Sequence, residues 1–501
     1  MMNKMILASP GAALSKTVLF AVAFMFAQYS HGGIPMSLPD AIRLAQEHSL
    51  DAKMARFSFL GNYWTYRSYR AELLPSVSLS GALLNYDRSV TSVRNYEDGR
   101  INYVENNSLS NSLTLSVSQN IVPTGGTVSL QSYLYHLEQF NYDLRTFNTQ
   151  PLRLVYDQPL RTFNSLKWRG KSEPVAYERA KRQYLESMQN IAVTVTNLYF
   201  SVLSAQSDYR QSVATAEERS RLYEQTKRRF SLGTVAKSEL LQLELSAINA
   251  RVAVKRDRLS LDDARFMLFT YLQAVQWDDI ELLAPEDVPD MILNEDDVMQ
   301  KAMTSSAHSM TQKLNLIESQ RNLAQAKSQR GVQVSLHSEL GLRNTADRFT
   351  DAYSHLQDNE IVGLTVAMPI FDWGVSKGRV RVAKANLDVV KTQIEQNDQE
   401  YQQTIKKLVM QFNLQYEQCH DAARAEEIAD ERYALTVQRF ETGAISVTEL
   451  NTAQQEKESA RSQYISQLRT YWNNYYNIQR HTLWDYVNNH EITTDFDKIV
   501  K

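Results

Sequence analysis

Two glutamates, Glu239 and Glu449, occupy corresponding places in two similar stretches of the chain, each six residues after a glycine. The glycines are Gly233 and Gly443, so both pairs are separated by 210 residues. Carboxylates that line an opening repel anions and attract cations, and this is the chemistry that these side chains could supply. A glutamate in the first turn of a helix is also stabilised by the helix dipole, which is a purely structural interpretation. The sequence leaves both interpretations open.

The remaining reactive side chains form no catalytic or metal-binding pattern. The nine histidines are scattered, and the sequence has neither an HExxH pair nor a glycine-rich phosphate loop. The single cysteine, Cys419, is followed by His420, but adjacent residues of a helix point in different directions. We therefore predict no catalytic residue, no cofactor, no metal site and no enzymatic activity.

The composition excludes several classes of protein. The 54 lysines and arginines nearly balance the 57 aspartates and glutamates and are interspersed with them, so we expect no nucleic-acid partner. A single cysteine excludes an intramolecular disulfide and a thiolate metal cluster, and none near the N-terminus could carry a lipid anchor. The chain has only 16 glycines and 11 prolines to build loops, which predicts long helices and strands.

Residues 1–33 have the features of a secretory signal peptide. Lys4 and Lys16 precede an apolar run at 18–27, about ten residues long, whereas a membrane-spanning helix needs about 20. An uncleaved anchor is the alternative, but the sequence turns polar directly after Ala27. No later segment approaches a spanning length, so we expect any membrane crossing by the mature protein to use β-strands.

Four segments alternate between apolar and polar residues with a period of two, which predicts β-strands with two different faces. The clearest is 109–121, where leucine, valine and isoleucine alternate with serine, threonine and asparagine. The others lie at 76–83, 332–342 and 362–370. In a soluble sandwich the polar face would meet water, and in an outer-membrane barrel it would meet a wet lumen. The signal peptide and the predicted helices favour the barrel.

Long stretches with almost no proline predict helices between these strands. Two are very long, at 172–232 and 374–441, and Pro174 is expected in the first turn of the former. Apolar residues between Tyr184 and Tyr209 alternate spacings of four and three, which is typical of a coiled-coil seam. About 60 residues, rising about 1.5 Å each, give a helix on the order of 90 Å long. Shorter helices are expected at 38–74, 238–272, 295–330 and 447–479.

The chain contains an internal duplication. The motif Arg-Phe-x-x-Gly at 229–233 recurs at 439–443, and Pro159 matches Pro369 at the same separation of 210 residues. Motifs nearer the N-terminus match at a separation of 257 residues, so the first half carries an insertion of 47 residues within about 85–151, which suggests an extra hairpin. We divide the chain into a signal peptide at 1–33, a first repeat at 34–260, a connector at 261–293, a second repeat at 294–480, and a tail at 481–501 without an assigned role.

The strands of one chain are too few to close a membrane barrel, which needs at least about eight. One copy supplies four strands, or six with the insertion, so a cyclic trimer would have about 12 or about 18. Ser132 and His136 interrupt the apolar face of 128–137. We therefore favour four strands per copy, with 124–148 as an extension at the extracellular rim. The predicted fold is a mixed α and β membrane protein, in which a trimeric transmembrane β-barrel continues into a long α-helical coiled-coil barrel.

Several short motifs resemble those of the TolC-like outer-membrane efflux proteins. They lie at 38–45, 71–80 and 158–160, in Met368-Pro-Ile-Phe-Asp-Trp-Gly374, and in the two Arg-Phe-x-x-Gly turns. The resemblance covers about 37–479 and departs from the family in the length of the inserted hairpin. It implies a homotrimeric exit duct in the outer membrane with a periplasmic helical domain. Such a duct passively conducts substrates from a periplasmic adaptor and an inner-membrane pump, in a tripartite efflux or type I secretion system. A periplasmic coiled-coil adaptor or scaffold is the alternative function.

By this resemblance, the two glycine turns are the periplasmic tips that close the duct and receive the adaptor. The residues expected to be exposed there are Gly233, Thr234, Val235, Ala236, Gly443, Ala444, Ile445 and Ser446. Glu239 and Glu449 would face the lumen near the entrance, where threefold symmetry would give a ring of about six carboxylates. In the family a further acid often follows one turn later, but here Gln242 and Thr452 occupy those places. The alternative is that each glycine merely caps a helix.

Overall fold

The computed structural model describes residues 34–94, 99–274, 280–285, 288–442 and 444–500. The predicted signal peptide at 1–33 lies outside this range. The described chain forms two compact units, and each unit draws on both halves of the sequence. The first unit contains residues 34–56, 185–302 and 405–493, and the second contains 57–184, 303–404 and 494–500. Among the described helices, none has a stretch long and apolar enough to cross a membrane.

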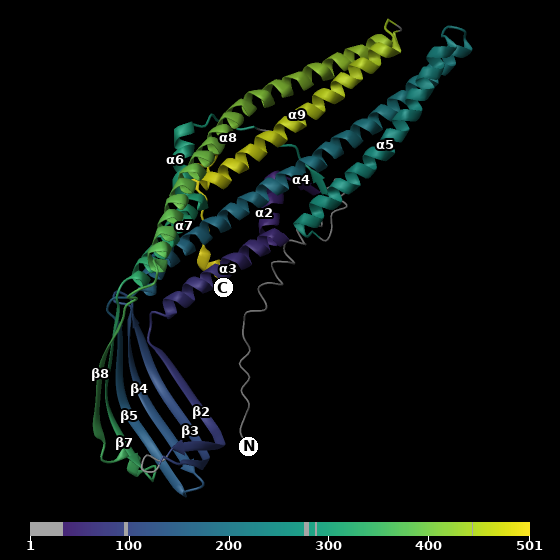
Figure 1. Ribbon diagram of the computed structural model, residues 1–501. Helices are drawn as coiled ribbons and strands as arrows, with labels where there is room; N and C mark the ends of the chain where they lie inside the picture. The colour runs from purple at the N-terminus through teal and green to yellow at the C-terminus, as the bar shows by residue number, and fades with distance from the viewer. Residues whose placement is uncertain (1–33, 95–98, 275–279, 286–287, 443, 501) are drawn as a thin grey trace, which may run out of the picture. The chain divides into compact units, whose positions relative to one another are not determined.

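Two pairs of helices repeat with equal lengths. Helix α4 (Ser165–Ser231) and helix α8 (Val375–Glu441) each have 67 residues. Each is followed by a helix of 36 residues, α5 (Lys237–Leu272) after α4 and α9 (Val447–Thr482) after α8. Figure 1 shows each pair as a hairpin. The predicted long and medium helices are therefore confirmed, and α5 continues past residue 260, where we placed the end of the first repeat.

Helix α4 begins earlier than its sequence pattern indicated. The side chain of Asn164 accepts a hydrogen bond from the backbone N–H of Lys167, with 2.9 Å between the nitrogen and the oxygen, and so caps a helix that starts at Ser165. Pro174 consequently lies inside α4, where it removes one backbone hydrogen bond. The placement of Pro174 in the first turn was wrong, because the asparagine cap adds more than two turns ahead of the proline.

Two predicted helices are each divided by a buried serine. The segment 38–74 forms α2 (Leu38–His48) and α3 (Leu50–Ala71), and the segment 295–330 forms α6 (Glu295–Ser305) and α7 (Ala307–Arg330). The breaks fall at Ser49 and Ser306, which are 257 residues apart and therefore equivalent in the duplication. Both serines are extended, with ψ of 156° and 159°. The prediction of uninterrupted helices was wrong here. Ser49 accepts a hydrogen bond from the N–H of Ala52 and so caps α3, whereas the side chain of Ser306 makes no cap bond to α7.

A six-stranded antiparallel sheet dominates the second unit. Its strands lie in the order β2-β3-β4-β5-β7-β8, as Figure 1 shows. They are β2 (Ser76–Arg94), β3 (Ile101–Ile121), β4 (Gly126–Gln139), β5 (Leu144–Pro159), β7 (Gln333–Ala346) and β8 (Gln357–Ala367). All four strands that the sequence alternation predicted are present. The short 3₁₀ helix η1 (Asp351–Tyr353) lies between β7 and β8.

The insertion supplies the strands β3 and β4, as an extra hairpin. Strand β4 pairs with β3 along its full length, since Gly126 lies opposite Ile121 at one end and Gln139 lies opposite Ser108 at the other. It pairs with β5 along almost the same length. It is therefore a central strand of the sheet. The segment 126–139 thus forms part of the sheet and not a separate extension of it. The preference for four membrane-spanning strands per copy stays a prediction, because the pairing of strands does not show which of them cross the membrane. Pairing on both sides satisfies the backbone groups of β4 despite the polar side chains at Ser132 and His136.

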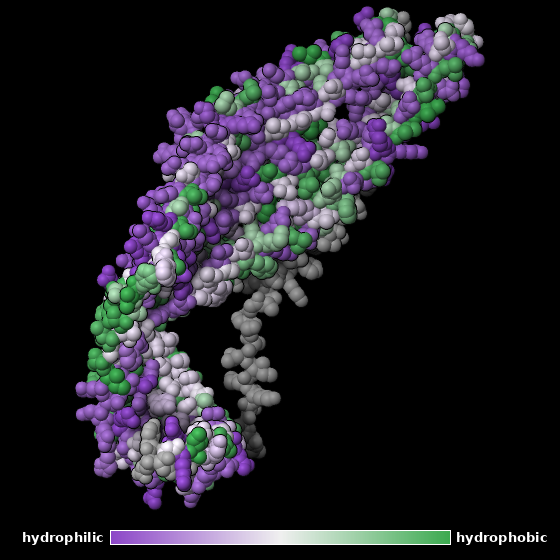
Figure 2. All heavy atoms as spheres, viewed as in Figure 1, coloured by the Kyte–Doolittle hydropathy of each residue, from purple (hydrophilic) through white to green (hydrophobic). Residues whose placement is uncertain are grey.

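The two faces of the sheet differ sharply in polarity. Leu130 lies opposite Val117 on one side and Leu154 on the other, and Leu154 lies opposite Leu340. These four side chains keep 37–54 % of their surface exposed. On the opposite face, serines of β2 and β3 accompany the glutamine and arginine side chains of β4 and β5. Figure 2 shows hydrophobic side chains gathered at the end of β8 nearest α8, at one edge of the sheet.

The remaining elements are short. In the first unit, β1 (Ile34–Met36) pairs in parallel with β6 (Ile280–Leu282), and β9 (Trp484–Asp485) pairs with β10 (His490–Glu491). In the second unit, the chain ends in α10 (Phe496–Val500), whose Phe496 ring lies 5.1 Å from the ring of Phe59 on α3. The tail is thus ordered by packing, although its sequence assigned it no role.

Candidate functional site

The tip of the first helical hairpin is a glycine-dependent helix cap. After α4 ends, Gly233 adopts a left-handed conformation with φ of +72°. The N–H of Thr234 donates to the carbonyl of Arg229 over 3.1 Å, and the N–H of Gly233 donates to that of Phe230 over 2.9 Å. This is the hydrogen-bond pattern of a Schellman motif. The capping interpretation of Gly233 is therefore correct, and it leaves the docking interpretation open.

The second tip repeats this arrangement. The N–H of Ala444 donates to the carbonyl of Arg439 over 3.0 Å, which is the counterpart of the bond from Thr234 to Arg229. Gly443 itself lies outside the described residues. The side chain of Ser446 accepts a hydrogen bond from the N–H of Glu449 over 3.3 Å and so caps α9. At both tips, described backbone hydrogen bonds thus cap the end of the long helix.

The predicted docking residues differ in how far they reach the surface. Thr234 and Ala236 are exposed at the first tip, as is Gly233, and Ala444 and Ser446 are exposed at the second. The larger side chains of Val235 and Ile445 are half-buried. Ile445 packs against a core cluster beneath the tip. Among the predicted docking residues, the exposed ones therefore have small side chains, and the exposed side chain of Leu232 lies directly before them.

A hydrophobic cluster joins the two hairpins just behind their tips. Its buried members come from all four helices and are Leu222, Leu243, Phe440, Val447 and Leu450. Burial of side chains of this size contributes about 1.5–3 kcal/mol each. The cluster thus holds the two hairpins together within the first unit.

Polar contacts reinforce this junction. The hydroxyl of Tyr433 on α8 donates to the carboxylate of Glu218 on α4. The guanidinium of Arg219, which is 3 % exposed, donates to the side chain of Gln454 on α9, and Gln454 donates to Thr215 over 2.8 Å. Burial raises the pKa of Tyr433 above its ordinary value, and the bond to Glu218 raises it further. Sequence reasoning missed these residues, because nothing in their spacing reports a contact between distant helices.

The two predicted entrance carboxylates lie in equivalent first turns. Glu239 is the third residue of α5 and Glu449 is the third residue of α9. Glu239 is half-buried and Glu449 is exposed. Within the described part of the chain neither forms an ion pair, and their placement at an entrance stays a prediction. The described residues also contain no group of three or more histidine, cysteine, aspartate or glutamate side chains that could hold a metal ion.

A comparison with known families identifies part of the chain directly. Residues 301–480 match the sequence profile of the family "Outer membrane efflux protein". These residues form an outer membrane efflux protein domain. The family prediction is confirmed, and the matched family is one of channels rather than of enzymes. No curated protein matches the sequence.

Solved structures with the same fold extend the likeness to nearly the whole chain. The CmeC outer membrane channel of Campylobacter jejuni has a TM-score of 0.65 at 14 % identity, over 92 % of this chain and 88 % of that one. The outer membrane protein VceC of Vibrio cholerae has a TM-score of 0.60 at 13 % identity, over 89 % and 95 %. The open-state MtrE outer membrane channel of Neisseria gonorrhoeae has a TM-score of 0.58 at 14 % identity, over 91 % of each chain. The efflux-domain chain therefore has the mixed α and β fold of outer-membrane channels.

Proposed function

We propose that this efflux protein is the outer-membrane exit duct of a tripartite efflux or type I secretion system, through which substrates pass without chemical change. The observation that carries the proposal is the exposed apolar face of the sheet. Val362, Leu364 and Val366 on the edge strand β8 keep 75 %, 60 % and 58 % of their surface exposed. An apolar face of this extent is stable against lipid and unfavourable in water.

Strand length supports a membrane crossing. The shortest strand, β8, has 11 residues and the others have 14 to 21. A tilted strand crosses the hydrocarbon layer with about 9–11 residues. All six strands are therefore long enough, and the polar face of the sheet would line an aqueous lumen.

The edges of the sheet support a ring of copies. Strands β2 and β8 have no described partner on their outer sides. Because six successive antiparallel strands alternate in direction, β2 and β8 run oppositely, so β8 of one copy can pair antiparallel with β2 of the next. A homotrimer closed in this way would have about 18 strands, and it would remove the exposed edges.

The helices also present surfaces suited to neighbouring copies. On α5, the exposed residues Leu241, Leu245, Ile248, Val252 and Leu259 follow heptad spacing. On α8, Met410, Leu414, Ile428 and Leu435 are likewise exposed and heptad-spaced. In coiled coils, apolar side chains with this spacing pack against a neighbouring helix. In the trimer they would pair between copies and form a periplasmic helical tunnel.

The exposed tips at Gly233 and Ala444 would receive the periplasmic adaptor, and the inner-membrane pump would feed the duct. The alternative function, a periplasmic coiled-coil adaptor or scaffold, explains the helical hairpins. It does not explain the sheet, whose apolar face would then stand in water.

Reconstitution tests the channel directly. The full chain, extracted in detergent, should migrate as a heat-resistant trimer and should produce discrete conductance steps in a planar bilayer. Boiled protein is the control and should give monomer and no conductance. A water-soluble monomer that inserts into no bilayer would overturn the proposal and favour the adaptor.

A further inference from the structure

Basic side chains gather where the two long helices leave the sheet in the second unit. Three lie near the start of α4 and three near the start of α8. These six residues, the basic collar, are Lys167, Arg169, Lys171, Lys377, Arg379 and Arg381. All except Arg169 are exposed, and Arg169 pairs with the carboxylates of Glu72 and Glu173. The three positions in each helix are 210 residues apart, so the collar repeats with the duplication.

Helix stability does not explain the collar. A helix N-terminus carries a partial positive charge and favours acidic side chains, yet neither long helix has an acidic residue in its first turn. The N–H groups at the start of α8 are already satisfied, because Asp372 accepts from Gly374 over 3.0 Å and from Ser376 over 2.8 Å. From Val375 to Leu387 the sequence has no acidic residue at all. The positive charge of α8 is therefore uncompensated along the helix itself.

An exposed aromatic group separates the collar from the apolar face of the sheet. The segment that joins β8 to α8 exposes 89 % of Ile370, 72 % of Phe371 and 88 % of Trp373. The rings of Phe371 and Trp373 pack edge to face, with centroids 4.6 Å apart. Figure 2 shows this hydrophobic surface as continuous with that of β8. Along the chain, an apolar strand is thus followed by exposed rings and then by positive charge.

This order matches the layers of a membrane surface. Apolar side chains suit the hydrocarbon, aromatic rings suit the level of the headgroups, and lysine and arginine reach the phosphates with their charged ends. We propose that the basic collar binds the phosphate groups of anionic phospholipids at the periplasmic surface of the outer membrane. This rests on the proposed function, because it requires the sheet to lie in that membrane.

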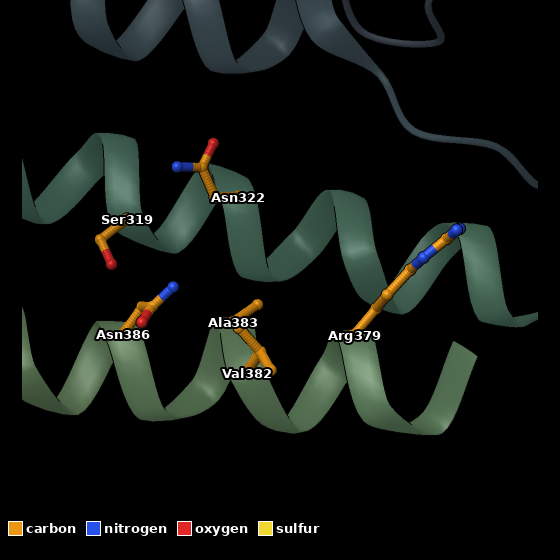
Figure 3. Close-up of a pocket in the computed structure, with 6 residues that line it drawn as sticks. All are labelled: Ser319, Asn322, Arg379, Val382, Ala383 and Asn386. Carbon is orange, nitrogen blue, oxygen red and sulfur yellow. The ribbon is translucent and has the colours of Figure 1, made fainter. Parts of the chain in front are cut away.

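Arg379 has a setting suited to a headgroup. It lies at one end of a groove of about 280 Å³ between α7 and α8, with Asn322 on α7 and Asn386 on α8 along its walls. Figure 3 shows Arg379 reaching from α8 toward α7 at one end of this groove, with Asn386 on α8 nearer the other end and Asn322 on α7. Guanidinium and amide N–H groups donate hydrogen bonds to phosphate oxygens, and the exposed Val382 beside them offers apolar contact.

The test uses the full chain in vesicles of phosphatidylcholine, with or without phosphatidylglycerol. Lipid affinity is measured by the phosphatidylglycerol retained on the purified protein and by the shift in its melting temperature. The variant with Lys377→Gln, Arg379→Gln and Arg381→Gln should lose about a hundredfold in affinity for phosphatidylglycerol, since each of the three basic groups contributes to binding at an anionic surface. The matched control removes three charges further along α8, with Lys391→Gln, Lys406→Gln and Lys407→Gln, and should bind as the unmodified protein does.

A charge-conserving variant distinguishes the loss of positive charge from misfolding as the cause of weaker binding. Lys377→Arg, Arg379→Lys and Arg381→Lys together should retain most of the binding. The inference is overturned if the glutamine variant keeps its preference for phosphatidylglycerol, or if the control loses it equally. The inference is also overturned if the glutamine variant loses its trimer equally in vesicles with and without phosphatidylglycerol. That result would assign the collar to contacts between copies. If the unmodified protein conducts but shows no preference for phosphatidylglycerol, only this inference fails. If it inserts into neither type of vesicle, the proposed function fails as well.

Discussion

The hydroxyl of Tyr433 donates a hydrogen bond to the carboxylate of Glu218, and this bond joins the two helical hairpins behind their tips. The residues are 215 positions apart and belong to different repeats. Because burial raises the pKa of Tyr433 above its ordinary value of 10, the hydroxyl keeps its proton even in alkaline solution near that value. The contact is therefore a polar link, here called the latch, between helices that otherwise meet through the hydrophobic cluster.

Replacing Tyr433 with phenylalanine should loosen the tips. The change leaves the carboxylate of Glu218 without this donor, which costs about 1–3 kcal/mol. We expect a larger single-channel conductance in planar bilayers, with the trimer intact. Tyr223→Phe is the matched control, since Tyr223 borders the same cluster. Equal conductance in the two variants would exclude the latch from control of the opening.

The same bond predicts a pH dependence. A tyrosine with a raised pKa contributes stability that is complete below its ordinary pKa of 10 and is lost as the pH rises through the higher folded value. The unmodified channel should therefore open further only in strongly alkaline solution, and Tyr433→Phe should show no such step. If the unmodified channel and the Tyr433→Phe variant both open further at the same pH, the opening does not depend on the titration of Tyr433.

Bulky side chains at the tips should block docking without unfolding the protein. Thr234→Trp and Ala444→Trp alter exposed positions, and neither residue has the left-handed backbone of Gly233. We expect export from cells to fall to background while trimers still assemble. Ser231→Trp at the exposed end of α4 is the control for added bulk. Export that survives both tip variants would show that these residues are simple caps.

Removal of the entrance carboxylates should change ion selectivity. With Glu239→Gln and Glu449→Gln, a trimer loses about six negative charges near its periplasmic opening. Cation preference and block by multivalent cations should both weaken in planar-bilayer recordings. Asp388→Asn with Glu395→Gln removes the same charge from exposed positions far from the tips. Identical selectivity in both double variants would remove Glu239 and Glu449 from the entrance.

A charge on the apolar face of β4 tests whether the inserted strands cross the membrane. Leu130→Lys should destabilise the folded protein by about 2–4 kcal/mol if its side chain faces lipid near the bilayer centre. Ser116→Lys is the control, because Ser116 pairs with Gln131 on the polar face. Stability is measured by urea unfolding in lipid vesicles. A tolerated Leu130→Lys would place β4 outside the membrane and return the trimer to about 12 spanning strands.

The two helix breaks offer a comparison within one chain. The hydroxyl of Ser49 accepts from the N–H of Ala52 over 3.1 Å, whereas the buried hydroxyl of Ser306 has no hydrogen-bond partner among the described residues. Ser49→Ala should therefore cost about 1 kcal/mol and lower the melting temperature. Ser306→Ala should be nearly neutral, since no hydrogen bond is lost. Equal effects would show that the serines act through burial alone.

The sequence alone determined the repeating parts of this protein. Alternation with a period of two identified strands on β2, β3, β7 and β8, because a sheet between two different environments forces that period on its side chains. Long runs with at most one proline identified α4 and α8, and the recurrence of Arg-Phe-x-x-Gly located both tips. These features are local, so they can be read in a window of a few residues.

Only the tertiary structure decided which segments pair. The sequence pattern of β4 is interrupted at Ser132 and His136, yet both its neighbours supply backbone partners, and it became a central strand. The breaks at Ser49 and Ser306 fall at residues that are buried by distant parts of the chain, and a helical pattern does not report such burial. The contact of Tyr433 with Glu218 depends on the packing of two hairpins far apart in the chain. Each outcome was set by interactions between distant residues, whose free energies outweigh the local preferences that the sequence displays.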